Sequence, residues 1–233
     1  MDPSVDPSVP PRAAALIDLL VDCGALTFGD FVAKSGRPTP YFVNAGKVGS
    51  GPQLRALGTL YADAIYETFG TDVDVLFGPA YKGISLAVAT GIALAEHHGR
   101  DLGVCFDRKE VKDHGEGGSL IGHDLTDGDR VVIIEDVTTA GTSIRASVPL
   151  LRSIADVEVV GLVVGVDRRE RGQRDDATAL DELAEELGLT TVALATIDDI
   201  VDHLSDREVD GHRVLSDADL QRISAYRAEY GVS

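Results

Sequence analysis

Hydrophobic residues occur along this chain in two alternating patterns. Short runs of about four to eight residues, rich in valine, isoleucine and leucine, indicate strands buried on both faces, and longer stretches with helical spacing lie between them. The strands predicted in this way cover residues 73–77, 102–106, 131–134, 159–166 and 191–195. The predicted helices cover residues 13–21, 53–69, 84–95, 144–154, 177–187, 197–204 and 217–230. We therefore predict an α/β fold with a mostly parallel central sheet flanked by helices.

The N-terminal part of the chain has a different pattern. Residues 26–33 and 41–44 are predicted to form two short strands, separated by the turn-forming sequence SGRPTP, and they predict a small N-terminal hood over about residues 20–50. The first residues, MDPSVDPSVPPR, are acidic and rich in proline and lack the basic start and apolar core of a signal peptide. We expect a disordered lead-in over residues 1–12 and a single domain over residues 13–233.

The sequence RVVIIEDVTTAGTSIR, residues 130–145, joins a predicted strand to a predicted helix. Glu135 and Asp136 follow the strand, and a loop of hydroxyl-bearing and small residues precedes the helix. The N–H groups and hydroxyls of such a loop can enclose a phosphate at the helix N-terminus, and paired carboxylates suit sugar hydroxyls or hydrated Mg²⁺. The alternative is an ordinary turn with a solvated acidic pair. The combination of these features at the end of a parallel strand, where such sheets bind ligands, favours a phosphate and sugar site. The loop lacks the GxxxxGK[ST] pattern, which argues against nucleoside triphosphate hydrolysis.

Two further segments are typical of contacts with anions. GPAYKG, residues 78–83, places a lysine between a predicted strand and helix, which predicts a second phosphate site, although a plain turn is the alternative. DRKEVKDHGEGG, residues 107–118, is too rich in charge and glycine to pack in a core. It is either a solvated hairpin tip or a flexible loop that closes over an anion, and it holds two of the few lysines in a strongly acidic chain.

A third cationic segment, DRRERG at residues 167–172, follows the valine-rich strand 159–166. It is therefore expected at the same end of the sheet as the acidic pair. A guanidinium there is a natural receptor for a carboxylate. A surface cluster of ion pairs is the alternative, and we favour it for Arg169, Arg171 and Arg174.

These motifs together resemble those of known enzymes. RVVIIEDVTTAGTSIR resembles the segment with which type I phosphoribosyltransferases bind phosphoribosyl pyrophosphate (PRPP). FGDFVAKSGRPTPYFVNAG, FGPAYKGI, RKEVKDHGEGG and DRRERG resemble segments of the orotate phosphoribosyltransferases, and the resemblance extends from about residue 20 to the end. It implies transfer of the 5-phosphoribosyl group from PRPP to orotate, giving orotidine 5′-monophosphate and pyrophosphate in de novo pyrimidine (UMP) biosynthesis. It also implies Mg²⁺ as cofactor, bound mainly through PRPP and with no direct protein ligand assigned.

The resemblance implies three sets of site residues. Those that bind PRPP are Lys34, Tyr81, Lys82, Arg108, Lys109, Lys112, His114, Glu135, Asp136, Val137, Thr138, Thr139, Ala140, Gly141, Thr142 and Ser143. Those that bind orotate are Lys34, Phe42, Val43, Thr139 and Arg168. Those that act in catalysis are Lys112, His114, Asp136 and Glu135. Many bacterial members have a second aromatic residue where this chain has Val43, so it is open whether this valine alters base binding.

The resemblance also implies a homodimer. A flexible catalytic loop over residues 107–120 would close over the active site, with residues 108–118 shared between the two subunits. Two alternatives remain open from the sequence. One is a phosphoribosyltransferase for another base, against which Arg168 and the hood argue. The other is a regulator that senses PRPP without catalysis, which should lack the charged loop or carry a basic nucleic-acid-binding face.

The bulk composition limits the partners and the environment. With a net charge of −18, the chain has no basic face for nucleic acid, and no apolar run reaches the roughly 20 residues of a membrane span. Its five lysines all precede residue 113, and such an acidic, lysine-poor composition is typical of proteins adapted to a salt-rich cytosol, with simple compositional bias as the alternative. The two cysteines, Cys23 and Cys105, lie in apolar contexts and are expected to be reduced thiols in the cytoplasm.

Overall fold

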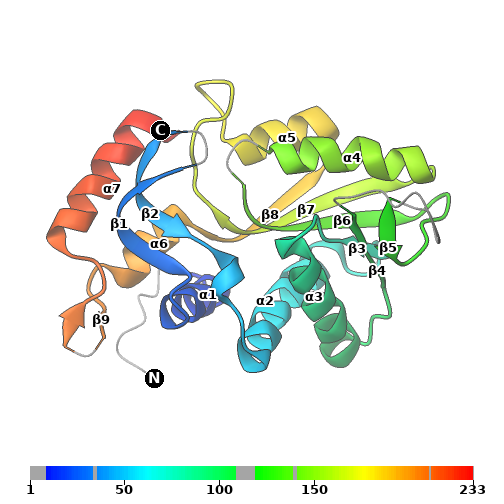
Figure 1. The fold of residues 1–233 in the computed structure, drawn as a ribbon, viewed down its shortest axis with the longest axis horizontal. Helices are drawn as coiled ribbons and strands as arrows, with labels where there is room; N and C mark the ends of the chain where they lie inside the picture. Colours follow the sequence, from blue (N-terminus) through cyan, green and yellow to red (C-terminus); the bar gives the residue numbers. More distant parts are fainter. Residues whose placement is uncertain (1–8, 34–35, 109–118, 139–140, 210, 233) are drawn as a thin grey trace.

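The computed structural model describes residues 9–33, 36–108, 119–138, 141–209 and 211–232. A six-stranded sheet with strand order β5-β4-β3-β6-β7-β8 lies at the centre of the fold (Figure 1). Its strands are β3 (Val75–Phe77), β4 (Gly103–Asp107), β5 (Leu120–Gly122), β6 (Arg130–Thr138), β7 (Glu158–Asp167) and β8 (Thr190–Thr196). The edge strand β5 pairs antiparallel with β4, and the other neighbouring strands of this sheet pair in parallel. The predicted α/β fold with a mostly parallel sheet is confirmed.

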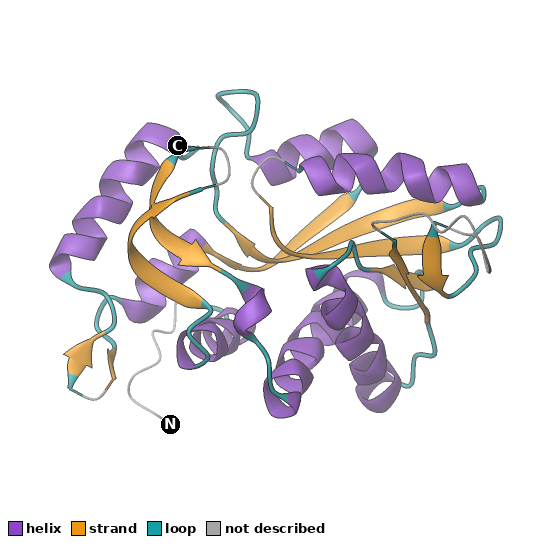
Figure 2. Ribbon diagram, viewed as in Figure 1, coloured by secondary structure: helices purple, strands orange, loops and turns teal. Residues whose placement is uncertain are grey.

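Helices cover both faces of the sheet (Figure 2). On one face lie α1 (Pro11–Asp22), α2 (Gly51–Phe69) and α3 (Lys82–His98), and on the other lie α4 (Thr142–Ile154) and α5 (Ala179–Leu187). Val132 and Ile134 of β6 belong to the core shared with the first three helices, whereas Val131 and Ile133 belong to the core under the other two. Successive side chains of a strand point to opposite faces, so a sheet covered on both sides requires the uninterrupted apolar run seen in the sequence.

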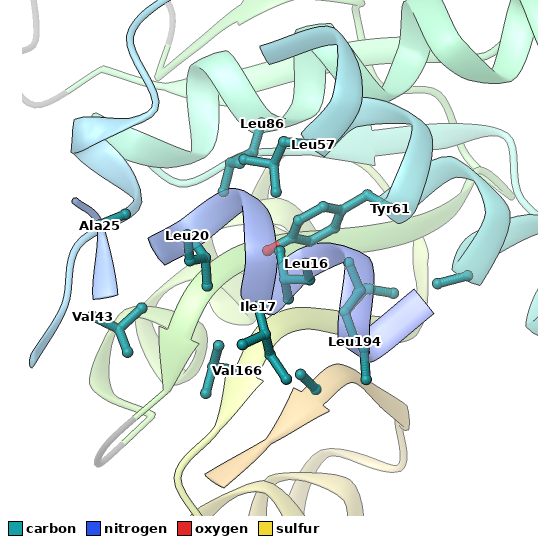
Figure 3. Close-up of a cluster of buried hydrophobic side chains, with 14 of the residues drawn as sticks. Leu16, Ile17, Leu20, Ala25, Val43, Leu57, Tyr61, Leu86, Val166 and Leu194 are labelled. Atoms are coloured by element: carbon teal, nitrogen blue, oxygen red, sulfur yellow. The ribbon is translucent and has the colours of Figure 1, made fainter. Parts of the chain in front are cut away.

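Helix α1 packs against the sheet and α2. Figure 3 shows its Leu16, Ile17 and Leu20 in one buried cluster with Tyr61 of α2 and Val166 of β7. The helix begins at Pro11, and Val9 just before it is only 4% exposed. The last residues of the predicted lead-in over residues 1–12 are therefore partly helical, and residues 1–8 lie outside the described residues.

The hood is an antiparallel hairpin of β1 (Leu26–Val32) and β2 (Pro38–Val43), followed by the short helix η1 (Ala45–Lys47). The C-terminal helix α7 (Asp217–Tyr230) lies beside this hairpin (Figure 1). The rings of Tyr41 in β2 and Tyr226 in α7 meet edge to face with centroids 6.1 Å apart. Helix α6 (Ile197–Leu204) and the small hairpin of β9 (Glu208–Val209) and β10 (His212–Arg213) connect the sheet to α7.

The structure differs from the sequence prediction at several boundaries. β6 continues to Thr138 instead of ending at residue 134, because its pairing with β7 continues as far as Thr138 opposite Asp167. Glu135 and Asp136 therefore lie within the strand. β5, β9 and β10 were not predicted, since each has only two or three residues and too few hydrophobic positions to show a period.

Two further expectations concern bulk properties. No helix within the described ranges is long and apolar enough to cross a membrane. Cys23 and Cys105 are both free, the former half-buried and the latter buried.

Candidate active site

The acidic pair of β6 connects two different loops. Because successive side chains of a strand alternate, Asp136 points toward α3 and Glu135 toward α4. Asp136 is buried and its Oδ2 lies 2.7 Å from the Nζ of Lys82, the first residue of α3. Glu135 accepts a hydrogen bond of 2.8 Å from the hydroxyl of Ser143 in the first turn of α4. The two carboxylates thus join the C-terminal end of β6 to the starts of two helices.

Glu135 has an unusual protonation equilibrium. Burial and, next in size, the negative charge of Asp136 raise its pKa to about 7, against the lowering effect of the hydrogen bond from Ser143. The buried hydroxyl of Tyr61 donates to the backbone carbonyl of Glu135 over 2.8 Å and fixes this part of the strand from the core side. Near neutral pH the carboxyl group of Glu135 is therefore only partly ionised.

The described residues at the two ends of the loop after β6 suit an anion. Gly141 precedes α4 with φ of +65°, and a Cβ added there would lie 2.7 Å from a methyl carbon of Leu183 in α5. Only glycine fits this position without strain. The N–H groups of the first helical turn have no partners within the helix, and the hydroxyl of Thr138 is buried without a hydrogen-bond partner among the described residues. Donors and the positive end of the helix thus converge on one place that suits an anion.

The predicted residues of this loop divide into three groups. The side chains of Thr142 and Ser143 are exposed at the helix start, whereas Val137 packs against the core, so any contact of Val137 with a ligand must come from its backbone. Thr139 and Ala140 lie outside the described residues.

The loop between β3 and α3 lies beside this site, because β3 and β6 are paired neighbours in the sheet. Gly78 and Gly83 close the loop so tightly that a Cβ at Gly78 would lie 2.0 Å from the carbonyl oxygen of Gly83. The Ala80–Tyr81 peptide bond is cis, and the side chain of Tyr81 is 73% exposed. Tyr81 and Lys82 are therefore presented at the same end of the sheet as the acidic pair.

Arg108 follows β4 at that same end. Its backbone N–H donates to the carbonyl of Ser119 over 2.9 Å, which joins the two ends of the predicted catalytic loop. Its Nε is buried and has no hydrogen-bond partner in the described part of the chain. Lys109, Lys112 and His114 lie outside the described residues, as does Lys34 of the hood.

The predicted base-binding residues of the hood are on opposite faces of β2. The ring of Phe42 is 40% exposed and lies 5.7 Å from the ring of Phe31. Val43 is 8% exposed and belongs to the core cluster, in which Figure 3 shows it. The structure therefore offers Phe42 as an aromatic surface and places Val43 behind it.

Arg168 lies just beyond β7 and is almost completely buried. Its Nε donates to Glu170 Oε1 over 2.6 Å, and its Nη2 donates to Thr39 Oγ1 over 2.8 Å. The guanidinium also lies over the ring of Tyr41, 4.6 Å from its centroid. The sequence predicted Arg168 as a site residue but not these partners. Among them, only Glu170 could have been found from the sequence, because it lies two residues away in the same DRRERG motif.

The other arginines of this segment form surface ion pairs, as favoured from the sequence. Arg169 pairs with Asp198 over 3.4 Å, Arg171 with Asp175 over 3.5 Å and Arg174 with Glu185 over 2.8 Å. They are at least a third exposed, and these ion pairs do not involve the acidic pair of β6.

Comparison with known proteins agrees with this geometry. Residues 45–194 match the family model described as the phosphoribosyl transferase domain. The match gives the class of protein to which the fold and the two loops belong. The chain is 54% identical over 216 residues to an orotate phosphoribosyltransferase from Lachnoclostridium phytofermentans, covering 93% of this chain and 96% of that protein. It is 52% identical over 209 residues to one from Thioalkalivibrio sulfidiphilus, covering 90% and 93%. A crystal structure of orotate phosphoribosyltransferase from Francisella tularensis matches with a TM-score of 0.76 and 33% identity, covering 92% of this chain and 98% of that one. The chain therefore belongs to the orotate phosphoribosyltransferase family.

Proposed function

We propose that this protein transfers the 5-phosphoribosyl group of PRPP to orotate, giving orotidine 5′-monophosphate and pyrophosphate in de novo pyrimidine biosynthesis. One observation supports this most strongly. Two loops suited to phosphate follow the neighbouring strands β3 and β6, and the 2.7 Å pair of Lys82 and Asp136 joins them. PRPP carries a phosphate at one end of its ribose and a diphosphate at the other, so it needs two anion sites separated by groups that bind hydroxyls.

Each part of PRPP has a place in this arrangement. The loop over residues 138–143 and the start of α4 hold the 5′-phosphate, and Glu135 and Asp136 bind the ribose hydroxyls. The pyrophosphate lies against Tyr81, Lys82 and the catalytic loop. That loop contributes Arg108, Lys109, Lys112 and His114.

The charges explain how the reaction is accelerated. As the bond from C1 of the ribose to pyrophosphate breaks, the sugar becomes cation-like and the departing group gains negative charge. The carboxylates of Glu135 and Asp136 shield the cationic sugar, and the lysines and arginine stabilise the pyrophosphate. Such preorganised charges act where charge develops, and exclusion of water by the closing loop strengthens them.

The residues present fit a magnesium ion that is held chiefly by the substrate. In the described ranges, no group of three or more His, Cys, Asp or Glu side chains could hold a metal by itself. The carboxylate of Asp136 is already paired with Lys82. We propose that Mg²⁺ binds chiefly through PRPP, and when bound it would neutralise part of the charge of the leaving pyrophosphate.

Orotate binds between the hood and the end of β7. The exposed ring of Phe42 offers a surface on which a pyrimidine can stack, and Arg168 provides the positive charge for its carboxylate. Lys34 and Thr139 complete this set by family resemblance. A base without a carboxylate would lack the charge-assisted contact with Arg168, which disfavours uracil and the purines.

We further propose a homodimer in the cytoplasm, with residues 108–118 of each subunit closing over the other subunit's site. Val88 and Ile92 lie one turn apart on α3 and are 41% and 56% exposed, which supports an apolar contact with a second copy. The two free cysteines are compatible with a reducing compartment.

The assignment is tested by initial rates of pyrophosphate release with PRPP, Mg²⁺ and a panel of bases. We expect Mg²⁺-dependent turnover with orotate and much slower turnover with adenine, hypoxanthine and uracil. Comparable or faster reaction with any of these three bases would contradict the assignment to orotate.

A further inference from the structure

Three segments that are distant in the sequence meet around the guanidinium of Arg168. Thr39 and Tyr41 come from β2 of the hood, Glu170 follows β7, and Tyr226 comes from α7. All of these side chains are buried, with exposed fractions of 8% or less. A charged cluster that is so completely removed from water needs a defined arrangement of hydrogen bonds.

The hydrogen bonds of Arg168 leave one nitrogen unused. Nε has one N–H, which donates to Glu170 over 2.6 Å. Nη2 has two, and it reaches Thr39 over 2.8 Å and the hydroxyl of Tyr226 over 3.4 Å. A guanidinium has five N–H groups, so two remain, both on Nη1. Nη1 has no hydrogen-bond partner among the described residues.

Glu170 is itself held in place. Its Oε1 also accepts a bond of 2.7 Å from the hydroxyl of Tyr226, and its Oε2 accepts one of 3.2 Å from Arg37. Its backbone forms a bridge with Gly231, next to the end of α7. With both carboxylate oxygens engaged, Glu170 is a fixed partner of Arg168 and not an ion that moves aside when a ligand arrives.

The balance of charge also favours a ligand. Arg37, Glu170 and Arg168 together carry one net positive charge, and the carboxylate between the two guanidinium groups keeps them from repelling each other. A single carboxylate at Nη1 would make the cluster neutral.

On the basis of the orotate specificity proposed above, we propose that Glu170, assisted by Tyr226, is a positioning residue that fixes Arg168 so that only Nη1 is presented to the carboxylate of the base. The bidentate fork of Nε and Nη2 is then occupied within the protein, and the ligand makes a directed contact with Nη1. Preference for a carboxylated pyrimidine depends on this orientation as well as on the charge of Arg168.

The matched ligands for a test are orotidine 5′-monophosphate and uridine 5′-monophosphate, which differ only in the carboxylate. Their dissociation constants are measured by equilibrium titration for the wild-type protein and for Glu170→Gln. Glutamine keeps the size of the side chain but has one acceptor oxygen, so it cannot serve Arg168, Tyr226 and Arg37 together. We expect the preference for orotidine 5′-monophosphate to fall about ten-fold or more, the scale of one charge-assisted hydrogen bond, while the affinities for uridine 5′-monophosphate and PRPP change less than about two-fold.

Two further variants make the test specific. Tyr226→Phe retains the ring contacts with Tyr41 and Tyr230 and removes only the hydroxyl, so it should lower the preference in the same direction by a smaller factor. If Glu170→Gln fails to fold, the result for Tyr226→Phe still tests the proposal. Glu182→Gln changes another buried carboxylate, one that accepts backbone N–H groups of Gln173 and Arg174, and it should leave the preference unchanged.

The outcomes separate this inference from the proposed function. A wild-type protein that binds both nucleotides equally would overturn the assignment to orotate, and the positioning role with it. If the wild type prefers the carboxylated nucleotide and the variants keep that preference while losing thermal stability, Glu170 is only structural. A preference that increases in Glu170→Gln would show that Glu170 competes with the ligand for Arg168, which also overturns the proposal.

Discussion

Lys82 Nζ lies 2.7 Å from Asp136 Oδ2, and this contact joins the start of α3 to the strand β6. A second ion pair, between Arg130 and Asp74 at 2.8 Å, lies at the opposite end of β6, where Asp74 precedes the neighbouring strand β3. Both ion pairs involve β6, but they lie at its opposite ends. The end with Lys82 has the phosphate loops, and the end with Arg130 has none of the predicted site residues that the structure describes.

This difference predicts the effect of two matched substitutions. Asp136→Asn should lower kcat by about 10² to 10³, because it removes a preorganised charge from beside the cation-like sugar. Asp74→Asn should lower thermal stability and leave kcat within about two-fold, since its partner only joins strand ends. Steady-state kinetics and melting curves of both variants check this. Equal losses of kcat would show that the pair of Lys82 and Asp136 has only a structural role.

The raised pKa of Glu135 predicts a pH dependence. Its pKa of about 7 means that the carboxylate gains its charge as pH rises through neutrality. If the ionised form stabilises the ribosyl cation, kcat/KM for PRPP should fall about ten-fold per pH unit below pH 7 and level off above it. Dividing the wild-type activity by the activity of Glu135→Gln at each pH cancels the effect of the titration of PRPP itself. A ratio that is constant from about pH 6 to 8.5 would contradict a role for the charge of Glu135.

The phosphate loop gives a prediction that does not involve charge. Gly141→Ala would place a Cβ at positive φ and 2.7 Å from Leu183. The loop must then shift, so we expect KM for PRPP to rise about ten-fold or more while the affinity for orotate is little affected. Gly128→Ala is a suitable control, because Gly128 also has a positive φ of +90° but no atom within 4 Å of the added Cβ. Unchanged KM in Gly141→Ala would place the 5′-phosphate elsewhere.

The shared catalytic loop predicts complementation between two inactive variants. Lys112→Ala and Asp136→Asn should each be nearly inactive, the former losing about 10² to 10³ in turnover. In a mixed dimer with loops exchanged, one site has both defects and the other has neither. Random reassociation should therefore restore up to about a quarter of wild-type activity. If mixed dimers form and activity stays at the level of the parents, each loop acts within its own subunit.

The sequence was informative wherever the signal was local. The apolar run of β6, the glycine at residue 141 and the lysine of the β3–α3 loop each have a chemical meaning within a few residues, and the structure places them at one end of the sheet. The surroundings of Arg168 were not predictable in the same way. Thr39 and Tyr226 lie 129 and 58 residues from it along the chain, so no periodicity or spacing could bring them together.

The prediction of where β6 ends was wrong for a related reason. Glu135 and Asp136 interrupt the apolar run in the sequence, yet the pairing with β7 continues through them, and only tertiary context supplies that pairing. The salt adaptation inferred from the acidic, lysine-poor composition stays a prediction, as does the domain division.

The most direct measurement of the central claim separates the two substrates. We claim that the ends of β3 and β6 bind PRPP and that Arg168 binds the carboxylate of the base. Arg168→Gln should therefore weaken orotate binding by about a hundred-fold, since it removes the guanidinium assigned to the carboxylate, and PRPP binding should change less than about two-fold. Retained PRPP binding also shows that the variant is folded. Separate equilibrium titrations of the two ligands give the answer: a loss confined to orotate is the predicted result, and equal losses for both ligands, or none for orotate, would contradict the claim.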